Sequence, residues 1–252
     1  MTPALFAAET GAGPRVIVFL HGFGGFHGIW DRLATELASE NRVIAYDLPG
    51  HGGSLDWPGA GPAKTAVRAI LADLNARGIE KAHLVGHSMG GSIAALAALS
   101  EPDRIASLTL LAPGGFGEEI AGLLLRRYGA AASQIDLRDC LTRMSGPDFR
   151  PSNETVEALA AIRALNGQSE KLVEIAAAIT ENDRQGVIPR DRLATLTMPV
   201  AVVWGTEDTV LPFSQTGDLP PAFTLYPVRE AGHMLPEEVP ETVLDIIRRT
   251  IR

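Results

Sequence analysis

A serine inside a glycine-rich turn is the first candidate for chemistry in this sequence. Ser88 stands at the centre of Gly86-His87-Ser88-Met89-Gly90, a G-x-S-x-G pattern. An apolar stretch, 82–85, precedes the pattern, and a run of small residues with helical character, 89–99, follows it. A strand, a sharp turn and a helix in this order would project the serine hydroxyl above the edge of a sheet, and the glycines avoid clashes there. The pattern predicts a nucleophile, the alternative being a glycine-rich turn with an incidental serine.

A serine hydroxyl reacts only when a base takes its proton and an acid orients that base. His233 follows Gly232 in a turn between the last predicted strand and the last predicted helix, so it is the candidate base. Asp208 lies just after the strand that ends at Trp204 and is the candidate acid, with the adjacent Glu207 as its competitor. We therefore predict a catalytic triad of Ser88, Asp208 and His233, against the alternative that His233 is an exposed loop residue.

Two backbone N–H groups are expected to stabilise the oxyanion that forms in acyl chemistry. The Met89 N–H stands at the start of the helix after the nucleophile, and the Phe23 N–H follows His21-Gly22 at the end of the first strong strand. The substrate pocket is predicted between this turn and a helical insertion, with Phe116 and Leu124 in its wall. Such walls favour a small to medium, largely apolar and uncharged acyl compound.

The other histidines have structural interpretations. We predict that His21, His51 and His87 brace loops and the serine turn, and that Asp47 ties down its own glycine-rich loop. His27 is expected to line the pocket or face solvent. Two cap cations, Arg126 and Arg127, are expected on a solvated face; the alternative is that one turns inward and binds a substrate carboxylate.

Apolar and amphipathic segments predict the elements that hold these residues. Strands are predicted at 16–20, 42–46, 82–85, 108–111, 199–204 and 224–227, and helices at 30–39, 64–77, 89–99 and 240–251. Strands that are apolar on both faces and alternate with helices indicate a parallel sheet with right-handed crossovers. The fold class is therefore α/β.

The alternation stops between 116 and 192. This stretch has only helical patterns, predicted at 118–128, 136–144, 153–165 and 168–182. We predict a core formed by 1–115 and 193–252 and a helical cap formed by 116–192.

Composition limits the classes of function. The 252 residues carry a net charge of −8 with a pI near 5.3, which disfavours nucleic acid and anionic membrane surfaces as partners. One cysteine, Cys140, cannot form an internal disulfide or a zinc cluster and is expected to be a small buried residue. The first 15 residues lack a signal-peptide pattern and no apolar run reaches the length of a membrane span, so we expect a cytoplasmic protein.

The motifs together resemble those of the α/β-hydrolase family. The resemblance rests on the serine turn and on four further segments: His21-Gly22-Phe23-Gly24-Gly25, Asp47-x-Pro49-Gly50-His51-Gly52, Gly205-x-x-Asp208 and Gly232-His233. It implies a mostly parallel eight-stranded sheet with a cap inserted after the sixth strand. The serine at position 88 differs from the haloalkane dehalogenase and epoxide hydrolase branches, which have Asp there.

A closer likeness involves 110–117 and 48–54, which resemble the hydrolase-like portion of acetoin dehydrogenase acyltransferase subunits. Those proteins also carry a lipoyl domain, which we do not expect in this sequence. Lipoyl-dependent acyltransferases use an H-x-x-x-D-G motif. The nearest match here, His27-x-x-x-Asp31, continues with Arg32 instead of Gly. The residues therefore do not favour acyl transfer.

These observations predict a serine hydrolase that cleaves an ester or related acyl compound through an acyl-enzyme on Ser88. The same triad supports hydrolysis of a carbon–carbon bond in a diketone-like compound, or lyase chemistry. A third possibility is a non-catalytic binding protein on a hydrolase scaffold. The expected partner is a small-molecule acyl substrate, with no cofactor, metal, nucleic acid or membrane, and the sequence leaves the oligomeric state open.

Overall fold

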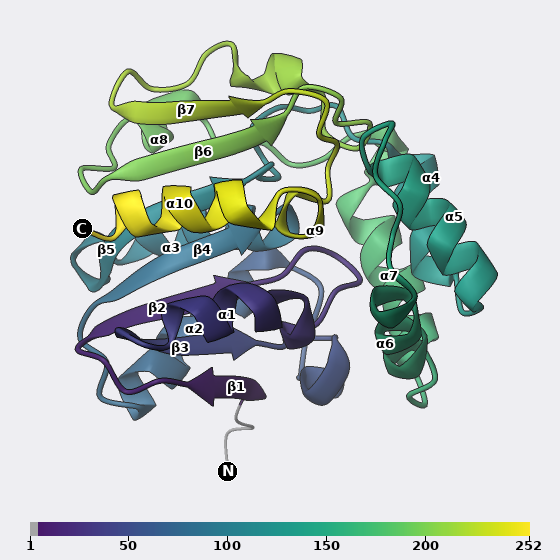
Figure 1. Ribbon diagram of the computed structural model, residues 1–252, viewed down its shortest axis with the longest axis horizontal. Coiled ribbons are helices and arrows are strands. Elements are labelled where there is room, and N and C mark those ends of the chain that lie inside the picture. Colours follow the sequence, from purple (N-terminus) through teal and green to yellow (C-terminus); the bar gives the residue numbers. More distant parts are fainter. Residues whose placement is uncertain (1–4) are drawn as a thin grey trace.

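The computed structural model describes residues 5–252, and its centre is a sheet of seven strands (Figure 1). The strands are β1 Ala7–Thr10, β2 Arg15–Leu20, β3 Asn41–Tyr46, β4 Ala82–His87, β5 Ile105–Leu111, β6 Val200–Gly205 and β7 Phe223–Val228. Their order is β1-β3-β2-β4-β5-β6-β7, and every neighbouring pair is parallel except β1 with β3. The central strands are buried, as their apolar character on both faces predicts.

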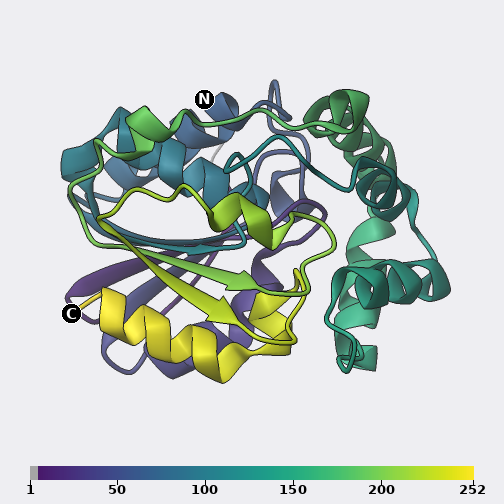
Figure 2. The same cartoon turned by 90° about the horizontal axis from the view of Figure 1, so that it is seen from above.

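Helices cover both faces of this sheet. They are α1 Asp31–Leu37, α2 Ala63–Ala76, α3 Met89–Ser100, α8 Arg190–Leu193, α9 Leu235–Glu238 and α10 Pro240–Thr250. Figure 2 shows α10, in yellow, on one face of the sheet and the blue helices α2 and α3 on the other. Helix α3 contacts both α2 and the short α8, so these three helices form one layer.

Four further helices gather beyond the carboxyl ends of the parallel strands (Figures 1 and 2). They are α4 Gly122–Ala130, α5 Gln134–Met144, α6 Asn153–Arg163 and α7 Gln168–Ile179. Two of them begin at a serine N-cap, because the Ser133 and Ser152 hydroxyls accept the N–H groups of Asp136 and Thr155. All four lie within the predicted insertion, and the carboxyl edge of the sheet faces them.

Several sequence predictions need correction. The described residues form seven strands instead of eight, so the insertion follows the fifth strand, and β1 was not predicted because it is a short, half-exposed edge strand. Helix α4 begins at Gly122 rather than at Glu118. The preceding backbone pairs elsewhere, since the Glu118 carbonyl accepts the Gln185 N–H at 3.0 Å and the Ala121 N–H donates to the Val210 carbonyl at 2.9 Å.

Helix α7 ends at Ile179 rather than at Asn182, because Asn182 and Asp183 both have a φ of 54°, which is outside the helical range. Cys140 is fully buried, which confirms its predicted packing role. None of the described helices combines the length and the apolar character that crossing a membrane requires. Residues 1–4 of the segment tested for a signal peptide lie outside the described residues.

Close backbone contacts at the serine turn require two of its glycines. A Cβ on Gly86 would lie 2.4 Å from the Gly90 carbonyl oxygen, and a Cβ on Gly90 would lie 2.1 Å from the Leu20 carbonyl oxygen. Real Cβ atoms do not approach backbone oxygens so closely. The first turn of α3 therefore rests directly on the end of β2.

We predict that Gly90→Ala lowers the free energy of unfolding by about 3 kcal/mol, because backbone atoms would have to separate. Gly186→Ala is the matched control, since no atom lies within 4 Å of a Cβ there, and it should change stability by less than about 1 kcal/mol. Urea denaturation of both variants measures the difference. Equal stabilities would contradict the tight contact between α3 and β2.

Candidate active site

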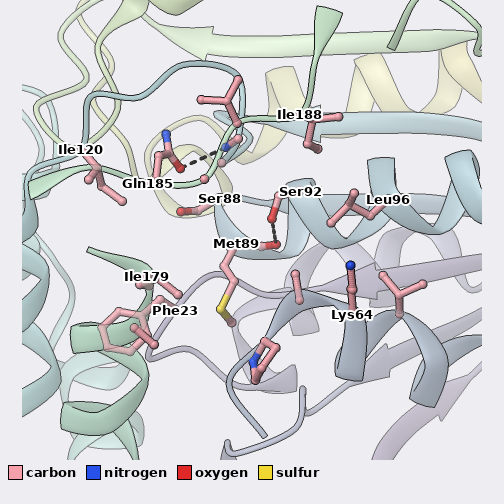
Figure 3. Close-up of a pocket in the computed structure, with 18 of the residues that line it drawn as sticks. Phe23, Lys64, Ser88, Met89, Ser92, Leu96, Ile120, Ile179, Gln185 and Ile188 are labelled. Atoms are coloured by element: carbon pink, nitrogen blue, oxygen red, sulfur yellow. Dashed lines mark hydrogen bonds between the residues drawn. The ribbon is translucent and has the colours of Figure 1, made fainter. Parts of the chain in front are cut away.

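The candidate nucleophile occupies a strained turn between β4 and α3. Ser88 has φ 51° and ψ −116°, a conformation that costs a residue with a side chain about 1–3 kcal/mol. Its N–H donates to the Leu111 carbonyl at 2.9 Å, and its own carbonyl accepts the Gly114 N–H at 2.9 Å. These bonds to the end of β5 hold the strained turn, and the half-buried Ser88 lines a cavity at the carboxyl edge of the sheet (Figure 3).

The structure brings Asp208 and His233 together. His233 Nδ1 lies 2.8 Å from Asp208 Oδ2, and the two residues are only 3% and 8% exposed. The other carboxylate oxygen of Asp208 accepts backbone N–H groups from Val210 and Leu211, both at 2.8 Å. A carboxylate accepts hydrogen bonds, so the network assigns the imidazole proton to Nδ1 and leaves the Nε2 lone pair available for a base.

Glu207 does not make this contact. Its side chain is exposed and accepts a hydrogen bond from the Thr206 hydroxyl at 3.3 Å. The geometry therefore favours Asp208 over its competitor as the partner of the histidine.

Ser88 and His233 line the same small cavity, and within residues 5–252 no hydrogen bond joins their side chains. Catalytic hydrogen bonds are often long before substrate binds and shorten in the complex. The structure thus brings the Ser88 hydroxyl to the same cavity as an imidazole that a carboxylate holds, and serine hydrolysis needs these three groups.

The two N–H groups predicted for the oxyanion hole lie beside Ser88. A Cβ on Gly22 would be 3.2 Å from Ser88 Cβ, so the loop that continues to Phe23 begins in close contact with the nucleophile. Within residues 5–252, the N–H groups of Phe23 and Met89 donate to no acceptor. They are thus available to an oxyanion.

The histidines that we expected to brace loops do so. His21 Nε2 accepts the Leu48 N–H at 3.0 Å while Nδ1 donates to the Gly22 carbonyl at 2.7 Å. His51 Nε2 likewise accepts the Gly24 N–H at 3.1 Å. Burial lowers the pKa of His21 to about 4 and the pKa of His51 well below its ordinary value, so both rings stay neutral.

His87 supports the backbone of the candidate base. Its Nε2 lies 2.8 Å from the His233 carbonyl oxygen and must carry the proton that it donates. Burial and the neighbouring His233 lower the pKa of His87 to about 3. His87 therefore adds no positive charge next to His233.

Asp47 ties down its loop, as predicted, because Oδ2 accepts the Gly53 N–H at 2.8 Å. Its other oxygen lies 2.8 Å from His27 Nδ1, and this hydrogen bond raises the pKa of His27. His27 therefore packs against Asp47 and is not among the described residues that line the cavities at Ser88.

Glu238 is a site residue that the sequence analysis missed. One of its oxygens accepts the N–H groups of Gly146 and Gly232, and the other accepts the N–H of Met234, all at 2.8 Å. The carboxylate thus fixes the backbone on both sides of His233 and ties it to the insertion. The acidic pair after the Gly-His turn was a possible signal, but the sequence could not say which glutamate accepts the N–H groups around His233.

The neighbouring Glu237 has a different environment. It lines the small cavity with Ser88 and His233. Burial and the nearby Glu238 raise its pKa to about 7. The fold therefore treats the two adjacent carboxyl groups differently. Backbone N–H groups stabilise the charge of Glu238, whereas burial removes water from Glu237 and disfavours its charge.

The main cavity has a volume of about 960 Å³, but two predicted wall residues are not part of its described lining. Phe116 is buried beneath it, with its ring 6.4 Å from the Trp204 ring and 5.1 Å from the Arg190 guanidinium. Leu124 is half-buried and packs against the hydrophobic core. The next residue, Leu125, lines the cavity instead. Both positions were inferred from helical spacing, but Phe116 precedes α4, and the spacing does not fix the rotation of α4 that decides between Leu124 and Leu125.

Arg126 and Arg127 make ion pairs on the surface, as expected. Arg126 donates to Asp183 at 2.7 Å and Arg127 lies 2.8 Å from Asp139. Neither is among the described residues that line the cavity.

A parallel sheet, a strained serine turn and a buried acid–histidine pair define a class of α/β hydrolases with a serine at the turn. The chain belongs to the α/β-hydrolase family, whose model matches residues 17–246.

Among its relatives is the dihydrolipoyllysine-residue acetyltransferase component of the acetoin cleaving system of Pseudomonas putida, 38% identical over 92% of this chain. The chain spans only 62% of that relative's length. The 2-hydroxy-6-oxononadienedioate/2-hydroxy-6-oxononatrienedioate hydrolase of Burkholderia vietnamiensis is 32% identical over 81% of this chain and 74% of its own length. A meta-cleavage product hydrolase from Pseudomonas fluorescens shares the fold, with a TM-score of 0.86 and 21% identity over 98% of this chain and 93% of its own.

We predict that Asp208→Asn lowers kcat for a 4-nitrophenyl ester by about 10⁴-fold, because the asparagine would favour the wrong imidazole tautomer. Glu207→Gln is the matched control and should be nearly silent. Steady-state release of 4-nitrophenol measures both. A loss in Glu207→Gln alone would transfer the role to Glu207.

The adjacent glutamates should affect stability in opposite directions. Glu238→Gln should lower the free energy of unfolding by about 2 kcal/mol, because N–H groups lose a charged acceptor. Glu237→Gln should raise it. The folded-state pKa of Glu237 is above the ordinary value of 4.5, so its ionisation destabilises the fold increasingly as pH rises from about 4.5 to about 7, and the effect levels off at higher pH.

Denaturation at about pH 5 and about pH 8 tests this pair. The stabilisation by Glu237→Gln should grow with pH to about 1–3 kcal/mol. A stabilisation that is independent of pH, or destabilisation by both variants, would contradict the assignment.

Proposed function

We propose that the chain is a serine hydrolase that cleaves an ester or related acyl compound through an acyl-enzyme on Ser88. The observation that carries the proposal is the buried contact between His233 Nδ1 and Asp208 Oδ2, beside a cavity that Ser88 also lines. The strained turn at Ser88 and the free N–H groups of Phe23 and Met89 support it.

In this mechanism, Ser88 Oγ bonds to the carbonyl carbon while its proton passes to His233 Nε2. The carbonyl oxygen becomes an anion that accepts hydrogen bonds from the N–H groups of Phe23 and Met89. Asp208 holds the imidazole in place and stabilises its positive charge. The bond to the leaving group then breaks, and that group departs with the proton from His233. Water repeats the sequence on the acyl-enzyme and releases the acid.

Carbon–carbon bond hydrolysis is the second candidate, favoured by the relative from Burkholderia vietnamiensis. That protein is named as a hydrolase of an oxo-dienedioate and is similar over most of this chain. The same residues would serve, with His233 delivering a proton to a carbon leaving group. Purified protein assayed on esters, thioesters and diketones separates these reactions.

Acyl transfer, the activity in the name of the relative from Pseudomonas putida, is less well supported by the residues of this chain. The side chain of His27, the nearest match to a transferase histidine, is engaged by Asp47. Ser88 and His233 line a cavity where His27 does not.

We predict that a fluorophosphonate labels the protein once, at Ser88, and that Ser88→Ala abolishes both labelling and turnover. Loss of a triad nucleophile costs about 10⁶-fold in kcat. Intact-protein mass spectrometry measures the adduct, and Ser92→Ala, which removes another hydroxyl in the cavity, is the control. Labelling that persists in Ser88→Ala would overturn the proposal.

A further inference from the structure

The main cavity continues from Ser88 along helix α3. Ser92, Leu96 and Leu99 line it at successive turns of this helix, and Figure 3 shows Ser92 and Leu96 following Ser88. From Ser88 to Ser100 the helix rises about 18 Å, at about 1.5 Å per residue. The space beside the nucleophile is therefore an elongated groove.

The walls of this groove are mainly apolar. Val67 of α2 lines one side, and Ile188 and Pro189, which precede α8, line the other. A cavity of about 960 Å³ is near the upper end of the range for small-molecule sites. A short acyl group would occupy only the end at Ser88, so the shape favours a long acyl chain.

The groove carries positive charge away from the nucleophile. Lys64 and Arg68 of α2 and Arg192 of α8 line it, and Figure 3 shows Lys64 extending from α2 towards α3. Its described lining contains no Asp or Glu. Within residues 5–252, the charged groups of these three side chains form no ion pair, and the adjacent Asp191 carboxylate accepts only the Arg192 backbone N–H, at 2.9 Å. Three cations without an ion-pair partner among the described residues therefore line one groove, on a chain with a net charge of −8.

The groove accommodates the acyl part of the substrate rather than the leaving group. His233 must deliver a proton to the leaving group, so that group has to lie near the imidazole. His233 lines the small cavity on the other side of Ser88 but is not among the described lining of the groove. The acyl chain therefore extends along α3.

We propose that the natural substrate is a long-chain acyl compound with an anionic group, a carboxylate or a phosphate, at the far end of its acyl chain. The apolar chain lies along α3, and Lys64, Arg68 and Arg192 bind the anion. This inference rests on the proposed function, because it uses the roles of Ser88 and His233. It replaces the sequence-based expectation of a small to medium, uncharged acyl compound: the proposed chain is long, apolar near Ser88 and charged at its far end.

Three 4-nitrophenyl esters of one long chain test the proposal. The chain should span about 12 Å, the rise from Ser88 to Leu96, and should end in a carboxylate, a phosphonate or a neutral carboxamide. We expect an anionic ester to exceed the carboxamide by about tenfold in kcat/KM, mainly through KM, because solvent-exposed ion pairs contribute modestly and three act together. The better anion identifies the natural end group, and added salt should reduce the preference.

Lys64→Gln, Arg68→Gln and Arg192→Gln, combined in one variant, should abolish this ratio. The matched control combines Lys81→Gln, Arg229→Gln and Arg249→Gln, which changes the net charge equally at exposed positions outside the described groove lining, and should retain the ratio. The ratio is measured within each variant, so a change in folded fraction cancels. No anion preference in the wild type, or an equal preference in both variants, would overturn the proposal.

Failure of the proposed function gives a different result. In that case 4-nitrophenyl acetate is not hydrolysed and fluorophosphonate does not label Ser88. Hydrolysis of the acetate without an anion preference rejects only the anionic subsite. Thermal-shift titration with the long-chain diacid and its monoamide measures the subsite without turnover, and equal shifts would also reject it.

Discussion

The site depends on one close contact, between the first turn of α3 and the ends of the central strands. A Cβ on Gly90 would lie 2.1 Å from the Leu20 carbonyl oxygen, so the helix can start here only because that residue is glycine. This contact forces Ser88 into its strained conformation and directs the Met89 N–H towards the carboxyl edge of the sheet. It also places the end of β2, and with it the loop to Phe23, beside the nucleophile. The strain of about 1–3 kcal/mol persists because the buried sheet and the hydrogen bonds to β5 fix the turn.

The other buried histidines around this turn carry no positive charge. His21, His51 and His87 are buried and have lowered pKa values, so these rings remain neutral. An imidazolium that forms on His233 therefore meets no competing histidine charge and has the Asp208 carboxylate at 2.8 Å. Because its proton lies on Nδ1, the free Nε2 can accept another from a hydroxyl. The loop-bracing histidines thus contribute to the proposed chemistry by staying uncharged.

Local constraints were predictable from the sequence, and long-range ones were not. The glycines around Ser88 predicted the position of the turn. The apolar segments predicted the order of the strands and helices. The wall of the cavity depends on how α4 is rotated, and a shift of one residue, from Leu124 to Leu125, turns a helix by about 100°. Glu238 was missed because one of its three N–H donors, Gly146, lies 92 residues earlier in the chain, so the sequence did not show that this carboxylate joins the His233 turn to the insertion. The cations of the groove come from α2 and α8, which only the folded chain brings to one cavity.

The two cavities at Ser88 divide the substrate into two parts. The small cavity, which His233 and Glu237 line, has room only for a compact group between the nucleophile and the proton donor. The groove along α3 is far larger, and its walls come from α2, α3 and the chain that returns from the insertion to α8. Selectivity for the acyl chain therefore does not reside in the insertion alone. Part of it lies on the same helix that positions the nucleophile, so a long acyl chain bound along α3 would be aligned with Ser88 by the contact that strains the serine.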